Sequence, residues 1–166
     1  MKRDAAQRRA WLSVCGLGML ALAGCATPRP QATDTTTFWS GRLALQLLST
    51  PPQSWSASFE LQGSAEQGQM TLLSPIGTTL ARLSWTPHAA RLEQGQDKTE
   101  SSNLQSLSQR LTGTDLPIAA LFEWLEGKAA DVPGWQVDFS AHPEGRLTAR
   151  RSTPAPEAVL RILLDR

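Results

Sequence analysis

Residues 54–62 read Ser54-Trp55-Ser56-Ala57-Ser58-Phe59-Glu60-Leu61-Gln62, an unbroken alternation of polar and apolar side chains. Successive side chains of a β-strand point to opposite faces, so this period of two predicts a strand with one buried and one exposed face. A Ser-Thr-Pro-Pro-Gln turn precedes it, and residues 63–68, with a glycine at each end, follow it. These flanks predict an antiparallel sheet of strands joined by short turns.

The same period of two continues on both sides of this segment. It predicts strands at 39–47, 70–73 and 79–85, then a short strand near 90–92 and a weak one at 97–101. Six sequential strands joined by short turns predict an antiparallel meander.

Beyond residue 101 the period becomes helical. Asn103 lies in a cap region before the first expected helix, and Gly113 suits its left-handed end. A second helix is expected to start near Pro117, a residue that suits a first helical position, and to stop at Gly127. Strands resume near 135–139, 146–150 and 159–164. The order predicts a mainly β, α+β fold in which two short helices pack on the sheet, at one face or at its mouth.

The N-terminus has the order of a lipoprotein signal. Four basic residues precede a short apolar run that ends in Leu22-Ala23-Gly24-Cys25, which looks like a bacterial lipobox. The run is shorter than the roughly 20 apolar residues that span a bilayer, so we expect residues 1–24 to be cleaved. Cys25 would then carry a diacylglycerol and an N-acyl chain, with no other cofactor. The alternative is an ordinary signal peptide with a chance cysteine.

The expected mature chain has 142 residues, enough for one domain, with 12 basic and 14 acidic residues and a net charge of about −2. Nothing in it suggests nucleic-acid binding. Cys15 lies in the leader, so no disulfide is expected. Residues 25–37 are rich in threonine and proline and predict a flexible tether, which leaves 38–166 as the folded domain. Ala26 follows the cysteine, and the absence of aspartate there favours the outer membrane by the sorting rule known for lipoproteins.

No pattern of catalytic residues is evident. His88 and His142 lie in turn-like stretches without ligand partners at metal-binding spacing, and we expect both to face solvent. Asp115, Glu123 and Glu126 fit a solvated helix face. We therefore expect neither an enzyme nor a metal site.

Several short segments, taken in their order along the chain, resemble those of a known protein family. They are Trp39-Ser40-Gly41-Arg42-Leu43-Ala44, residues 72–81, Leu111-Thr112-Gly113, Leu116-Pro117, Trp124-Leu125-Glu126-Gly127 and Gly134-Trp135-Gln136-Val137. Together with the lipobox, they resemble the LolB family of outer-membrane lipoprotein receptors. The resemblance implies an unclosed antiparallel barrel lidded by helices, whose apolar cavity accepts acyl chains of lipoproteins from the periplasmic carrier LolA. It implies delivery of that cargo to the outer membrane, whose inner leaflet the chain contacts, and we expect a monomer.

One departure from the family pattern concerns the segment after the second helix. Family members usually have a further hairpin there, whereas here only Lys128 to Pro133 intervenes. The sheet could lose two strands, and the cavity could be open on that side.

Two sets of residues are candidates for the site. The first would line the acyl cavity, and the alternative is that its members simply fill a core. It comprises Trp55, Phe59, Leu61, Met70, Leu72, Leu83, Trp85, Leu121, Phe122 and Trp124. The second is the turn around Pro75, Ile76 and Gly77, where an isoleucine at the tip is unusual. The alternative is that Ile76 folds back on the sheet, but the resemblance implies that it contacts the membrane.

Two other functions fit the same sequence. An outer-membrane lipoprotein could be a scaffold subunit of an envelope assembly machine and hold a protein partner at its sheet edge or groove. A carrier of lipid A or phospholipid is the third possibility.

Overall fold

The computed structural model describes residues 37–165. The predicted signal peptide, Cys25 and the tether up to residue 36 lie outside the described residues. The strands are β1 (Thr37–Leu48), β2 (Gln53–Gly63), β3 (Gly68–Leu73), β4 (Thr79–Trp85), β5 (Ala90–Gln94), β6 (Asp97–Ser101), β7 (Trp135–Asp138), β8 (Arg146–Arg151) and β9 (Glu157–Leu164). The helices are α1 (Leu104–Thr112), α2 (Ile118–Leu125) and a 3-10 turn η1 (His142–Glu144).

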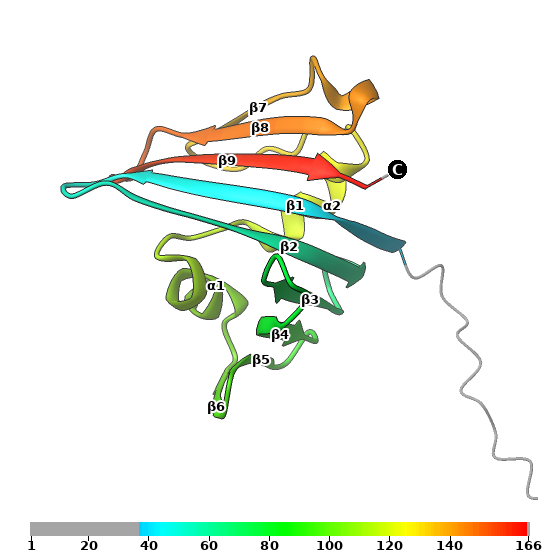
Figure 1. Cartoon of the computed structure of the whole chain (residues 1–166), viewed down its shortest axis with the longest axis vertical. Coiled ribbons are helices and arrows are strands. Elements are labelled where there is room, and N and C mark those ends of the chain that lie inside the picture. Colours follow the sequence, from blue (N-terminus) through cyan, green and yellow to red (C-terminus); the bar gives the residue numbers. More distant parts are fainter. Residues whose placement is uncertain (1–36, 166) are drawn as a thin grey trace, which may run out of the picture. The chain divides into compact units, whose positions relative to one another are not determined.

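Within residues 37–165, the strands form one sheet in the order β6-β5-β4-β3-β2-β1-β9-β8-β7 (Figure 1). Every neighbouring pair is antiparallel. The end strands β6 and β7 do not pair with each other, so the sheet is open. This confirms the predicted mainly β, unclosed antiparallel fold with two short helices. Residues 128–133 connect α2 to the edge strand β7 and contain no strand.

The first and last strands of the described chain lie next to each other in the interior of the sheet. β1 pairs with β2 on one side and with β9 on the other. Gly41 makes the second pairing possible, because a Cβ at this position would lie 2.1 Å from the Leu163 carbonyl oxygen. The glycine in the Trp39-Ser40-Gly41 segment is therefore needed for close strand approach.

The two ends of α1 follow the predicted capping. The Asn103 side chain accepts hydrogen bonds from the backbone N–H groups of Gln105 and Ser106. Gly113 ends the helix in the left-handed conformation, at φ 77°. These contacts satisfy backbone groups that a short helix leaves unpaired.

α2 begins one residue later than the sequence predicts. Pro117 has φ −77° but ψ 79°, which is not helical, so it precedes the helix as its N-cap. The N–H of Ile118 donates to the Leu116 carbonyl at 2.8 Å in the turn that leads into α2. Six of the eight α2 residues are buried, so the helix is held chiefly by packing of its apolar side chains.

The core lies between one face of the sheet and the two helices. Leu45, Leu61 and Leu83, at most 1% exposed, come from three different strands, and Leu121 and Leu125 come from α2. All belong to a single hydrophobic cluster. The period of two in the strands has therefore placed one apolar face of the sheet against the helices.

Candidate functional site

The structure brings the ten predicted cavity residues together in the core. Nine are buried: Phe59, Leu61, Met70, Leu72, Leu83, Trp85, Leu121, Phe122 and Trp124. Trp55 is half-buried and packs against the same cluster. Of the ten, only Trp85 and Phe59 also line pockets described among residues 37–165. All ten belong to one hydrophobic cluster or pack against it.

Aromatic side chains join α2 to the sheet. Trp85 and Phe122 make an edge-to-face contact with ring centroids 6.2 Å apart, and Trp124 meets Trp135 of β7 at 5.8 Å. The Trp85 Nε1–H donates to the Ser64 carbonyl at 3.1 Å. The Trp124 Nε1–H is buried and finds no acceptor in the described part of the chain. The contacts between α2 and the sheet are thus largely apolar, as the linings of ligand sites commonly are.

One expectation about the histidines was wrong. His142 is half-buried and not free in solvent: its Nε2 lies 2.9 Å from the Leu125 carbonyl oxygen, and its ring packs edge-on against Phe139. The imidazole gives the C-terminal end of α2 a polar contact with η1, because a helix end leaves carbonyl groups unpaired. His88 is exposed as predicted.

The predicted membrane-contact turn is well formed. The Gly77 N–H donates to the Ser74 carbonyl at 2.9 Å, which makes residues 74–77 a β-turn, and the Ser74 N–H donates to the Thr78 carbonyl at 2.8 Å. Pro75 occupies the second position, which proline favours, and Gly77 has φ 82°. The Ile76 side chain is 89% exposed at the tip. It does not fold back on the sheet, so an apolar group is presented to the surroundings.

A groove of about 810 Å³ that sequence reasoning missed lies beside α1 and the connection between the helices. Its walls include Leu104, Leu116, Trp135 and Arg151. The alternation along β8 could have indicated that Arg151 faces inward. Leu147 and Ala149 lie on the same side of the strand as Arg151, and both are buried.

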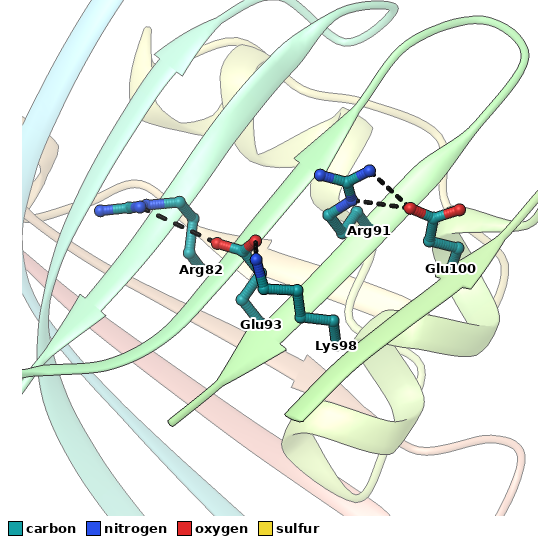
Figure 2. A network of polar contacts seen from close by, with 5 residues as sticks. All are labelled: Arg82, Arg91, Glu93, Lys98 and Glu100. Carbon is teal, nitrogen blue, oxygen red and sulfur yellow. Dashed lines mark hydrogen bonds and ion pairs between the residues drawn. The ribbon is translucent and has the colours of Figure 1, made fainter. Parts of the chain in front are cut away.

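The opposite face of β4, β5 and β6 carries charged pairs. Arg82 and Lys98 flank Glu93 at 3.9 and 3.4 Å, and Arg91 contacts Glu100 at 2.5 Å (Figure 2). The partners are directly opposite in the strand register. Exposed pairs of this kind contribute little stability, but charges along an edge strand disfavour pairing with other sheets.

Two negative findings concern the described residues. None of their helices is long and apolar enough to cross a membrane. Residues 37–165 contain no group of three or more His, Cys, Asp or Glu side chains placed to hold a metal ion.

The described chain is an α+β protein of the half-barrel class. Its antiparallel sheet is open, and short helices cover the apolar face of the sheet. The chain belongs to the LolB family, because the family model described as "Outer membrane lipoprotein LolB" matches residues 38–155. This confirms the predicted resemblance and an outer-membrane lipoprotein localization.

Similar relatives carry the same name, "Outer-membrane lipoprotein LolB". One from Shewanella baltica (strain OS223) is 30% identical over 83% of this chain and 68% of its own length. One from Azoarcus sp. (strain BH72) is 28% identical over 91% of both chains. One from Shewanella sp. (strain MR-4) is 32% identical, but the chain spans only 56% of its length. Their names describe lipoproteins and no enzymatic activity.

Proposed function

We propose that this chain is an outer-membrane receptor that accepts lipoproteins from the soluble periplasmic carrier LolA and inserts them into the outer membrane. Its cargo is an acylated protein, and the acyl chains bind between the inner face of the sheet and α1 and α2. The receptor acts as a monomer held at the membrane by lipid on Cys25.

The observation that carries this proposal is the way α2 is attached. Six of its eight residues are buried, and Pro117 gives it no side-chain cap. Its contacts with the sheet are mainly apolar, and apolar contacts have no fixed direction. Acyl methylenes can replace them, each contributing about 0.8 kcal/mol when buried. Displacement of α2 therefore exchanges one apolar surface for another.

The apolar character of the interior also bears on specificity. The predicted lining set contains no charged side chain, so it recognises hydrocarbon and not a particular protein sequence. A receptor of this kind accepts many lipoproteins that share the same acylated cysteine. The membership of the LolB family supports the same proposal.

Photocross-linking during cargo transfer tests this proposal. A photoreactive phenylalanine analogue replaces Phe122, which is 7% exposed on the inner side, or Phe38, which is 57% exposed. The chain carries Cys25→Ala and is mixed with a purified carrier–lipoprotein complex without membranes. We expect cross-links from position 122 to the acyl chains and none from position 38. Cross-links from neither position, or cargo that stays on the carrier, would refute the proposal.

A further inference from the structure

The 810 Å³ groove contains two charged side chains among the residues that line it, Arg151 and Asp115. Its volume lies within the range of about 300–1,000 Å³ that is typical of sites for small ligands. The remaining walls are largely apolar and include Leu104, Ile118 and Val132. None of the ten predicted acyl-cavity residues lines this groove, although Leu116 and Ile118 of its walls belong to the same buried cluster.

Arg151 is only 5% exposed and has few partners. Its Nη2 donates to the Pro156 carbonyl at 2.9 Å, and its guanidinium carbon lies 5.9 Å from the centre of the Trp135 ring. The Nε–H is buried and has no acceptor, and no carboxylate of the described residues lies within 4.0 Å of the guanidinium. Burial lowers the pKa of Arg151, and Asp115 opposes this shift. A buried cation without an anion is unfavourable, so the site is suited to bind one.

Asp115 gives the groove its opposite charge. Its half-buried carboxylate accepts a hydrogen bond from the Gln105 side-chain amide, which is neutral. Asp115 and Arg151 line the same groove without forming an ion pair. Each charge is therefore available to a ligand group of opposite sign, and their sum is zero.

We propose that this groove binds a glycerophospholipid with a phosphoethanolamine headgroup. Arg151 donates to the phosphate, Asp115 accepts from the ammonium group, and the apolar walls contact an acyl chain. A charge-assisted bond to phosphate suits the planar guanidinium. An anionic headgroup such as phosphoglycerol would leave Asp115 unpaired, and a free phosphate would leave the apolar walls exposed. This site goes beyond the proposed receptor function and does not depend on lipoprotein transfer.

Calorimetric titration of the mature-length chain carrying Cys25→Ala tests this assignment. The probes are dihexanoylphosphatidylethanolamine and dihexanoylphosphatidylglycerol below their micellar concentrations, glycerophosphoethanolamine and inorganic phosphate. The variants are Asp115→Asn and Arg151→Gln, with Arg150→Gln as the matched control, because Arg150 is the exposed neighbour on β8. Circular dichroism establishes that each variant is folded.

We expect saturable binding of the ethanolamine lipid. The glycerol lipid, glycerophosphoethanolamine and inorganic phosphate should bind more weakly. Since hydrogen bonds to charged groups contribute about 1.5–3 kcal/mol, Arg151→Gln should weaken binding of both lipids about tenfold or more. Asp115→Asn should weaken binding of the ethanolamine lipid and strengthen binding of the glycerol lipid, so the preference between the two lipids is reversed. Arg150→Gln should bind as the unsubstituted chain does.

Three results would overturn the assignment. They are no saturable binding of the ethanolamine lipid, equal effects of Asp115→Asn on both lipids, and glycerophosphoethanolamine binding as tightly as the lipid. The Asp115 result does not require the Arg151 variant to fold. Cargo transfer from the carrier is measured separately, so failure here leaves the receptor proposal standing.

Discussion

Replacing Ile76 by glutamate should separate folding of the chain from insertion of its cargo. Ile76 is 89% exposed, so little burial is lost, and the free energy of unfolding should change by no more than about 0.5 kcal/mol. If the turn tip enters the membrane, nearly all of the 1.5–3 kcal/mol available from burying an isoleucine is gained there. Its loss corresponds to a reduction of about 10- to 100-fold in insertion, and the carboxylate adds a desolvation cost.

The assay has two stages that are scored separately. Loading is the transfer of a labelled lipoprotein from the purified carrier to the receptor, and insertion is its later appearance in liposomes. Ile76→Glu should take up cargo normally, because the Ile76 side chain is 89% exposed and is not part of the buried cluster. Ile76→Leu keeps the apolar surface and should insert cargo almost as the unsubstituted chain does.

Two results would contradict this reasoning. A glutamate variant that melts several degrees earlier would show that Ile76 contributes to folding despite its exposure. Insertion at the normal rate would show that the turn does not enter the membrane.

The other predictions concern stability. Gly41→Ala should cost about 1–3 kcal/mol in a denaturant titration, because its Cβ would overlap the Leu163 carbonyl; an unchanged midpoint would mean that β1 and β9 can separate freely. Asn103→Ala removes the α1 cap and should cost about 1 kcal/mol in the same titration, whereas a loss below a few tenths would show that water replaces the cap. The N–H of Ser140 donates to Asp138 and lowers the pKa of that carboxyl. The resulting stabilisation is present at neutral pH and is lost as the pH falls from the ordinary carboxyl value through the lowered pKa. Asp138→Asn should therefore flatten the acid side of the melting-temperature profile, and an unaltered profile would exclude this contribution.

Local patterns predicted most of the fold. The alternation in 54–62 and 79–85 fixed both the strands and their buried faces, since one face of each strand meets the helices. The glycine at 113 and the cap at 103 set the ends of α1. The start of α2 was misplaced by one residue, because Pro117 has a non-helical ψ that its φ preference does not reveal.

The sites were less predictable because they depend on contacts between distant segments. His142 meets the Leu125 carbonyl only after η1 packs beside α2. Arg151 and Asp115 share a groove although 36 positions separate them in the chain. The periodicity of a sequence does not show which distant segments come together. The exposure of Ile76 could be predicted because it depends only on the turn that contains it.

The pairing of β1 with β9 affects the order in which the strands of the sheet can fold. β1 to β6 are joined by hairpins and can associate as they emerge, but the free edge of β1 has no partner until residues 157–164 are present. Non-local pairing of this kind slows folding and leaves an apolar central strand exposed to aggregation in the meantime. A nonsense change shortly before residue 157 would remove the strand that joins β1 to β8, and therefore β7 and β8 would also lose their attachment to the sheet.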